Sequence, residues 1–193
     1  MKLDSKYWNN RYEQFDTGWD VGSITPPLEE YFSSFKMFNS QILVIGAGNG
    51  YEVEYLHNNN FLNVYYLDFS KKACSNFKNR VPSFPDQNIL CKDFFNLKGK
   101  FDLIIEQTFF CAIKKNKRKL YVEKVYDLLK SKGKLVGLLF DREFEDDHPP
   151  FGATKELYAN LFENHFSFKI FENCKNSLNS RKDHEIFIEF EKK

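Results

Sequence analysis

Three glycines and one aspartate stand at a spacing that suits a ligand built on a nucleoside. Residues 42–45 form an apolar run of mostly β-branched side chains, typical of a strand covered on both faces. Gly46, Gly48 and Gly50 follow at once, and Asp68 lies 20 positions beyond Gly48. Glycine tolerates positive φ and lets a ligand approach the backbone closely. An acid at the end of the second strand can accept hydrogen bonds from both ribose hydroxyls, which indicates an adenosine-containing cofactor.

The spacing of the glycines is G-x-G-x-G, not the G-x-G-x-x-G of dinucleotide sites. Counting from either starting glycine, the missing third one falls on Tyr51 or on Val53. The pattern is more usual for S-adenosylmethionine (SAM) than for NAD, so an NAD-dependent oxidoreductase is the weaker alternative. A turn needed only to leave the strand is the other interpretation of these glycines.

An acid followed by an aromatic residue stands at the end of two predicted strands. Asp68, with Phe69 assigned to the same site, ends the strand over residues 64–67 and can also cap the next helix together with Ser70. Asp93 and Phe94 end the strand over 88–91. There the acid would take the exocyclic amine of adenine while the ring packs on the base. An ordinary surface turn is the alternative.

Aromatic side chains recur at helical spacing near the amino terminus, after a cap at Asp4 or Ser5. The aromatic residues of this stretch are Tyr7, Trp8, Tyr12 and Phe15, and Trp19 follows in a loop with two glycines. Aromatic rings attract a cation such as a sulfonium through their quadrupole. The pattern predicts either a lid over the cofactor or an amphipathic helix laid on the domain.

The strand over residues 101–105 leads into the segment 106–113, which should face the reacting methyl group. Ligands of open parallel sheets sit beyond the carboxyl ends of the strands. The N/D-P-P-Y/F motif of many base-directed methyltransferases is absent from this position. A similar His-Pro-Pro-Phe occurs at 148–151, after the fifth strand, where that chemistry does not take place.

These residues are expected to be positioned by alternating strands and helices. A helix over 120–129, ended by Gly133, and a fifth strand over 135–140 precede two late strands, 166–171 and 185–190. The pattern predicts an α/β Rossmann-like sandwich with a mostly parallel seven-stranded sheet and a final antiparallel hairpin. We expect one domain over 1–193, with a helical lid over 1–35 and the core over 41–193.

Composition excludes several classes of function. The 193 residues carry a formal net charge of +1 with mixed signs, which does not suit nucleic-acid binding. The densest basic run, 114–119, is interpreted as the solvated start of a helix. No secretory signal or membrane-length apolar run is visible, and the four cysteines and four histidines are scattered. We therefore expect a cytoplasmic protein without a metal site or a membrane partner, as a monomer or weak homo-oligomer.

The chain resembles the thiopurine methyltransferase family and, within it, the plant-type halide and thiol methyltransferases. The matching segments are Trp8, Tyr12 and Trp19 with TGWDVG at 17–22, IGAGNG at 45–50 with LDFS at 67–70, and FDLIIEQTFFCAI at 101–113. The pair Arg181 and Glu185 also fits the family pattern. Two positions depart from the halide and thiol branch: Tyr12 replaces a frequent tryptophan, and Glu106-Gln107 replaces Asp-Tyr.

The resemblance implies class I methyltransferase architecture with SAM as the methyl donor and S-adenosylhomocysteine as its product. The residues that it implies in cofactor binding are Trp8, Tyr12, Trp19, Gly46, Gly48, Asp68, Phe69, Asp93, Phe94 and Glu106. The three aromatics would close over the cofactor, and the two glycines would pass beneath it. Arg118 is a candidate for its methionine carboxylate, with a surface charge as the alternative.

The reaction implied is methyl transfer to a small soft nucleophile, such as a thiol, hydrosulfide or halide. Such an anion needs no proton removed during attack, so alignment and exclusion of water would suffice. The predicted acceptor pocket is lined by Trp19, Gln107, Phe109 and Phe110, and the candidates to orient the acceptor are Gln107, Arg142 and His148. An oxygen or nitrogen acceptor, with Glu106 or His148 as base, is one alternative. A non-catalytic SAM-binding protein is another.

Overall fold

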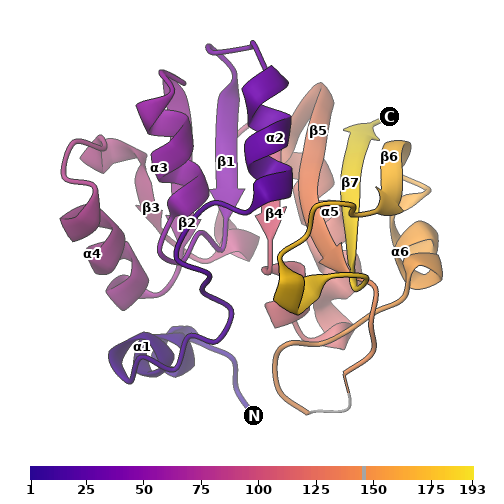
Figure 1. Cartoon of the computed structure of the whole chain (residues 1–193), viewed down its shortest axis with the longest axis horizontal. Coiled ribbons are helices and arrows are strands. Elements are labelled where there is room, and N and C mark those ends of the chain that lie inside the picture. Colours follow the sequence, from indigo (N-terminus) through magenta and orange to yellow (C-terminus); the bar gives the residue numbers. More distant parts are fainter. Residues whose placement is uncertain (145–146) are drawn as a thin grey trace.

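A computed structural model describes residues 1–144 and 147–193, built around a single seven-stranded sheet (Figure 1). The strands are β1 Gln41–Ile45, β2 Asn63–Asp68, β3 Ile89–Cys91, β4 Phe101–Gln107, β5 Leu129–Phe140, β6 Phe166–Asn173 and β7 Glu185–Lys192. Their order is β3-β2-β1-β4-β5-β7-β6. The first five are parallel, while β7 is antiparallel to both β5 and β6. The predicted parallel sheet with a final antiparallel hairpin is confirmed.

Helices cover both faces of this sheet. They are α1 Ser5–Glu13, α2 Pro26–Ser34, α3 Tyr51–Asn58, α4 Lys71–Arg80, α5 Arg118–Leu128 and α6 Lys155–Phe162. Buried side chains of α2, α3 and α4 share one core cluster, and those of α5 and α6 share the other. Along β1, Ile42 and Val44 belong to the first cluster, whereas Leu43 and Ile45 belong to the second. Strand residues alternate between faces, so a run of four apolar residues is what a doubly covered strand requires.

Three helix starts follow directly from local side chains. Asp4 accepts a hydrogen bond from the Tyr7 backbone N–H at 3.1 Å and so caps α1. The Ser70 hydroxyl accepts one from Ala73 N–H at 3.1 Å, at the start of α4. Thr154 caps α6 in the same way. Each cap satisfies a backbone donor that the helix leaves without a partner.

The boundary between α5 and β5 differs from the prediction. The helix ends at Leu128, before Gly133, and the strand already begins at the fully buried Leu129. Leu129 pairs with Phe101, and Lys134 pairs with Leu103, so β5 bulges between these two points. Burial of Leu129 against the sheet ended the helix one turn before the glycine signal.

The carboxyl ends of the parallel strands gather at one edge of the molecule, where α1 and the segment after β5 also lie (Figure 1). Asn9 of α1 accepts hydrogen bonds from the Ser70 hydroxyl at 2.8 Å and from Lys72 N–H at 3.2 Å. These contacts hold the amino-terminal helix on the first turn of α4, close to Asp68.

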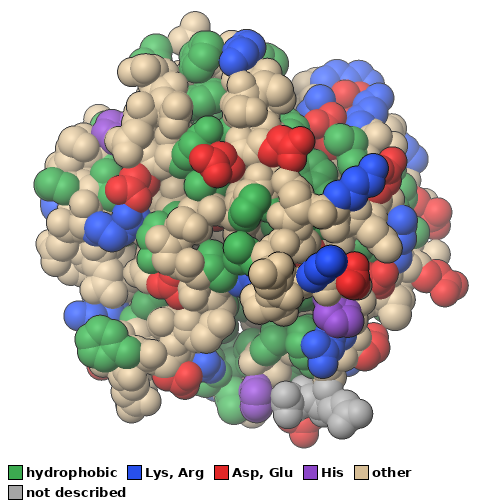
Figure 2. Space-filling view, in the orientation of Figure 1, with side chains coloured by type: hydrophobic (Ala, Val, Ile, Leu, Met, Phe, Trp, Pro, Cys, Tyr) green, Lys and Arg blue, Asp and Glu red, His purple; other side chains and the backbone are tan. Residues whose placement is uncertain are grey.

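Acidic and basic side chains are interspersed on the face seen in Figure 2, as the near-zero net charge suggests. In the part of the chain that the structure describes, no helix combines the length and the apolar character needed to cross a membrane.

Candidate functional site

A cavity of about 1120 Å³ lies at the carboxyl ends of β1 to β5. One side is formed by α1 and the loop that follows it, and the other by residues after β5 and before β7. Several residues that the sequence analysis assigned to the site line it. They are Trp8, Tyr12, Trp19, Gly46, Asp68, Phe69, Asp93, Phe94, Phe109, Arg142 and His148. The volume exceeds the roughly 300–1,000 Å³ of ordinary ligand pockets, so a cofactor and a second molecule fit together.

The carboxylate of Asp68 is fixed by backbone donors on both sides. Its Oδ2 accepts a hydrogen bond from Gly48 N–H at 3.0 Å, and its Oδ1 accepts one from Ser70 N–H at 2.8 Å. Burial raises the pKa of Asp68 to about 6, although these backbone hydrogen bonds oppose the shift. Two carboxylate oxygens can accept about four hydrogen bonds, so acceptor capacity remains toward the cavity.

The glycine loop allows close approach by the two elements that flank it. Gly46 and Gly48 have φ of 57° and 55°, which side-chain-bearing residues adopt with strain. A Cβ on Gly46 would lie 2.2 Å from the Phe109 ring, and one on Gly48 would lie 2.6 Å from the Tyr12 hydroxyl. The two glycines therefore let Tyr12 of α1 and Phe109 after β4 pack closely against the loop at the carboxyl end of β1. Gly48 itself lines a second, smaller cavity and not the main one.

Asp93 and Phe94 belong to a short turn at the end of β3 whose side chains line the cavity. Asp93 accepts a hydrogen bond from Phe95 N–H at 2.9 Å and caps a short 3₁₀ turn. Its neighbour Phe94 is buried and packs edge-on against Phe109, with ring centroids 5.3 Å apart. Both side chains line the cavity next to Asp68. The turn thus presents an acid and an aromatic ring side by side.

Three aromatic rings of the amino-terminal segment form one wall. Trp19 packs nearly perpendicular to Trp8 and to Tyr12, at centroid distances of 5.3 and 5.7 Å. The Arg11 guanidinium lies 4.9 Å from the centre of the Trp19 ring. Burial raises the pKa of Tyr12 far above its ordinary value, so this hydroxyl stays protonated. The wall is a packed cluster and not a set of independent side chains.

Glu106 and Phe110 are buried in the core and line neither cavity. This corrects the predictions that Glu106 contacts the cofactor and that Phe110 lines the acceptor pocket. Glu106 is fully buried and accepts hydrogen bonds from Phe109 N–H at 2.7 Å, Phe110 N–H at 2.9 Å and Tyr121 OH at 2.6 Å. Phe110 is 1% exposed and packs among the α5 and α6 rings. Burial raises the pKa of Glu106 to about 7, but the carboxylate borders neither cavity and is therefore no candidate base.

Gln107, which the sequence analysis placed in the acceptor pocket, does not line the main cavity. It borders the second cavity, of about 50 Å³, together with Gly46, Gly48 and Glu52. The Thr25 hydroxyl donates to its Oε1 at 3.2 Å. Its Nε2 is buried without a hydrogen-bond partner among the described residues. A buried donor without an acceptor is costly, so this amide suits an acceptor group brought by a ligand.

Arg118 neither reaches the cavity nor lies on the surface, so both interpretations from the sequence are corrected. It is 5% exposed, and its Nη2 donates to the carbonyls of Phe151 at 3.0 Å and Gly152 at 2.8 Å. The guanidinium also lies 5.1 Å from the centre of the Phe110 ring. Arg118 therefore fixes the residues that directly follow Pro149 and Pro150, and these two prolines line the cavity.

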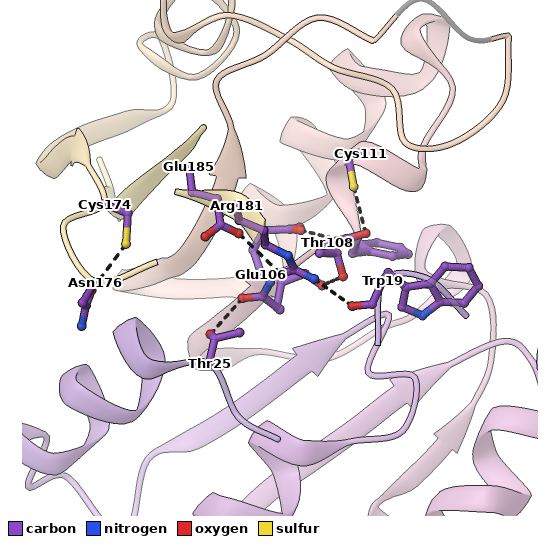
Figure 3. A network of polar contacts seen from close by, with 11 residues as sticks. Trp19, Thr25, Glu106, Thr108, Cys111, Cys174, Asn176, Arg181 and Glu185 are labelled. Atoms are coloured by element: carbon purple, nitrogen blue, oxygen red, sulfur yellow. Dashed lines mark hydrogen bonds and ion pairs between the residues drawn. The ribbon is translucent and has the colours of Figure 1, made fainter. Parts of the chain in front are cut away.

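Arg181 is the main site residue that sequence reasoning did not assign. Its Nη1 pairs with Glu185 at 3.5 Å, and its Nη2 donates to the Trp19 carbonyl at 2.8 Å (Figure 3). Both members of the pair are buried, and Arg181 borders both cavities. The sequence shows the four-residue spacing of Arg181 and Glu185, but it does not show that Arg181 contacts the loop at Trp19.

The far end of the cavity is aromatic and cationic. The side chains there come from β5, the segment after it and the residues before β7: Phe140, Arg142, Phe144, His148, Pro149, Pro150, Arg181 and His184. The Arg142 and Arg181 guanidinium groups lie 5.2 and 5.8 Å from the centres of the Phe144 and Phe140 rings. The His148 Nδ1 lies 2.9 Å from the Pro149 carbonyl. This end of the cavity therefore combines aromatic rings with positive charge, of which the Arg181 charge is paired with Glu185.

Comparison with known proteins agrees with this arrangement. The model of the family described as thiopurine S-methyltransferase matches residues 3–192. The chain belongs to this family. It is a SAM-dependent methyltransferase, which confirms the predicted family, enzyme class and cofactor and removes the NAD alternative.

Two relatives of this methyltransferase show the range of the family. A probable thiol methyltransferase 2 of Arabidopsis thaliana is 31% identical over 159 residues, covering 80% of this chain and 70% of the relative. A thiopurine S-methyltransferase of Photobacterium profundum is 24% identical over 181 residues, covering 83% of each chain.

Solved structures of other methyltransferases share the fold. A Burkholderia thailandensis 1,6-didemethyltoxoflavin N1-methyltransferase, with S-adenosylhomocysteine bound, superposes with a TM-score of 0.78 at 14% identity. The match covers 97% of this chain and 86% of that one. A TehB-like SAM-dependent methyltransferase of Corynebacterium glutamicum has a TM-score of 0.69 at 14% identity, covering 98% of both chains. The methyltransferase sandwich predicted from the sequence is therefore confirmed.

Proposed function

We propose that this enzyme transfers the methyl group of SAM to a small soft nucleophile: a thiol, hydrosulfide or halide. The observation that carries the proposal is the distribution of carboxylates around the cavity. The described carboxylates that line it, Asp4, Asp68 and Asp93, come from the start of α1 and from the ends of β2 and β3. The described residues of the opposite end supply arginine, histidine and aromatic side chains. An acceptor that arrives as an anion suits that end and requires no carboxylate base.

The residues at the donor end fit the cofactor. Asp68 would accept the ribose hydroxyls with the lone pairs that Gly48 and Ser70 leave free. Asp93 and Phe94 would hold the adenine, with Phe69 beside them. The second cavity, with the unpartnered Gln107 amide, fits the methionine end. When bound, SAM supplies a methyl group on a positively charged sulfur.

At the acceptor end, the protein would act by orientation, electrostatics and exclusion of water. Trp19 and Phe109 would wall the space between donor and acceptor. The Cys111 thiol lines the same cavity, and its pKa responds to the local field. Burial raises that pKa to about 12, and the Glu106 carboxylate adds to the rise, while the charges of Arg181 and Arg118 oppose it. Cys111 is therefore a neutral part of the cavity wall.

An anionic sulfur or halide can attack the methyl carbon in line with the bond to the leaving sulfur. Holding the reacting atoms at roughly 3–3.5 Å contributes several kcal/mol toward the barrier without any acid or base. The aromatic wall of Trp8, Tyr12 and Trp19 would keep water out and face the sulfonium with π-electron density. No step then depends on a proton taken up by the protein.

The names of the relatives support this acceptor class. Besides the probable thiol methyltransferase, a Brassica oleracea thiocyanate methyltransferase 1 is 28% identical over 159 residues. Both names describe soft sulfur-containing acceptors.

We further propose that residues 1–193 form one methyltransferase domain, with 1–35 as its lid, and that it acts in the cytoplasm. A monomer or weak homo-oligomer without nucleic-acid or membrane partners stays our prediction.

A screen of methyl acceptors tests the proposal. The purified enzyme is supplied with SAM and with hydrosulfide, iodide, thiocyanate, thiophenol, phenol or aniline, and volatile products are detected in the headspace. We expect methylation of at least one of the soft acceptors, with phenol and aniline inactive. Methylation of phenol or aniline alone would instead support an oxygen or nitrogen acceptor. Donor binding without any transfer would support a non-catalytic SAM-binding protein.

A further inference from the structure

Two cysteines far apart in the sequence meet at the adenine edge of the cavity. Cys91 is the last residue of β3, and its register partner on β2 is Asp68. Cys74, on the first turns of α4, donates its thiol to the Asp68 carbonyl, with a sulfur–oxygen distance of 3.6 Å. Burial raises the pKa of the Cys74 thiol, and the neighbouring Cys91 adds to the rise. Both cysteines therefore adjoin the same residue, Asp68, in the reduced protein.

The two thiols differ in access. Cys91 is exposed and lines the main cavity next to Asp93, whereas Cys74 is buried below it. An accessible thiol beside a second thiol that can resolve it is the usual arrangement of redox-sensitive cysteines. The other two cysteines pair with oxygen atoms: Cys111 with the Thr108 carbonyl and Cys174 with the Asn176 side chain. The chain thus holds its thiol pair at the donor end of the site.

We propose that Cys74 and Cys91 are a redox modification site, at which a hydroperoxide converts the two thiols into a disulfide that weakens donor binding. The proposal rests on the donor placement described above, with adenine beside Asp93 and ribose on Asp68. It concerns binding of the donor and does not depend on which acceptor is methylated.

The reaction balances with the peroxide as the only oxidant. The Cys91 thiolate attacks one peroxide oxygen, the O–O bond breaks, and Cys91 becomes a sulfenic acid while the other oxygen leaves as water or an alcohol. The Cys74 sulfur then attacks the Cys91 sulfur, the S–O bond breaks, and water leaves with the Cys74 proton. The two thiols lose two electrons in total, and the peroxide gains them.

Disulfide formation changes the geometry at the donor end. The two sulfurs must come within about 2.05 Å of each other, and Cys74 gives up its hydrogen bond to the Asp68 carbonyl. The bond would draw the end of β3 toward α4, and Asp93 and Phe94 follow Cys91 directly in the chain. A bound donor would cover Cys91, because that side chain lines the cavity. Oxidation and donor binding should therefore oppose each other.

The test treats the full-length enzyme with hydrogen peroxide, with or without S-adenosylhomocysteine present. Peptide mapping then looks for a Cys74–Cys91 linkage, and calorimetry measures the affinity for S-adenosylhomocysteine. We expect the linked peptide, an affinity at least tenfold lower, recovery with dithiothreitol, and slower oxidation when S-adenosylhomocysteine is present. Cys74→Ser and Cys91→Ser should lose the effect. Cys111→Ser and Cys174→Ser are matched controls that should keep it.

Two results would overturn the proposal. One is peroxide-treated protein without the linked peptide, whether or not its affinity changes. The other is quantitative linkage with unchanged affinity for S-adenosylhomocysteine. A reduced enzyme that binds S-adenosylhomocysteine but methylates no acceptor contradicts the proposed function alone, because the readout here is binding.

Discussion

The two ends of the cavity are built in different ways. At the donor end, Asp68 and Asp93 are held by backbone N–H groups within a few residues of the strand ends or within the glycine loop. At the acceptor end, Arg118 reaches carbonyls 33 and 34 positions away, and Arg181 reaches the Trp19 carbonyl across 162 positions. The donor end is thus local in the chain, whereas the acceptor end depends on contacts between distant segments.

This difference bears on how the two ends can vary. A carboxylate that is held by backbone N–H groups stays in place as long as the strand end and the loop keep their conformation. A segment that is held by a long side chain moves when that side chain or its partner is substituted. One fold can therefore keep its donor and exchange its acceptor. Substitutions at each end should accordingly separate the affinity for the donor from the Michaelis constant for the acceptor.

The largest effect is expected from Asp68→Asn. Two hydrogen bonds from the ribose to a charged acceptor contribute about 1.5 kcal/mol each, so donor affinity should fall about 100-fold. Calorimetry with S-adenosylhomocysteine measures it. Asp86→Asn removes an exposed carboxylate that pairs with Lys78 and should leave the affinity unchanged. Equal affinities for Asp68→Asn and the parent enzyme would contradict the placement of the ribose.

Arg118→Met tests the acceptor end. The Phe151 and Gly152 carbonyls would lose their buried donor, which should lower the free energy of unfolding by about 1–3 kcal/mol. We expect the acceptor Michaelis constant to rise roughly tenfold, a shift of about 1.4 kcal/mol, while donor affinity stays within twofold. The neighbouring Lys119→Met, on an exposed position of α5, is the control. Weaker donor binding with an unchanged acceptor Michaelis constant would show that Arg118 supports the donor end and would contradict this prediction.

The pH dependence of donor binding sharpens the comparison. The pKa of Asp68 is raised to about 6, so the carboxylate is ionised above that pH and protonated below it. The ionised form accepts both ribose hydroxyls, and affinity should therefore fall roughly tenfold between pH 7 and pH 5. Binding of S-adenosylhomocysteine measured across this range checks it. A similar slope in Asp68→Asn would assign the titration to another group.

The smallest effect is expected from Trp19→Ala, because Trp19 lies between the two ends. Loss of one aromatic ring beside a sulfonium costs about 1 kcal/mol, or roughly fivefold in SAM affinity. The acceptor Michaelis constant should change as well, since the Trp19 side chain also lines the cavity in which the acceptor would bind. Phe15→Ala removes a ring that is 91% exposed and should change neither quantity. Unchanged kinetics and binding in Trp19→Ala would contradict its role as a wall.

The errors made from the sequence concentrate at the tip of β4. Glu106 and Gln107 are adjacent in a strand, so their side chains point to opposite faces. The sequence does not tell which face meets the cavity: Glu106 turns toward Tyr121 in the core, while Gln107 turns toward Thr25. In the turn that follows, Phe109 lines the cavity and Phe110 is buried.

By itself, the sequence determined the succession of strands and helices, three of the helix caps and the place of Asp68 at the end of a strand. These features depend on residues close together in the chain, such as Asp68 with Ser70, whose roles follow from local backbone geometry. The tertiary structure alone decided the burial of Arg118, the contact of Arg181 with Trp19 and the placement of Cys74 and Cys91 beside Asp68. The physical reason is that long side chains and neighbouring strands bring together groups that are far apart in the chain. No periodic pattern in the sequence indicates which of these groups will lie side by side.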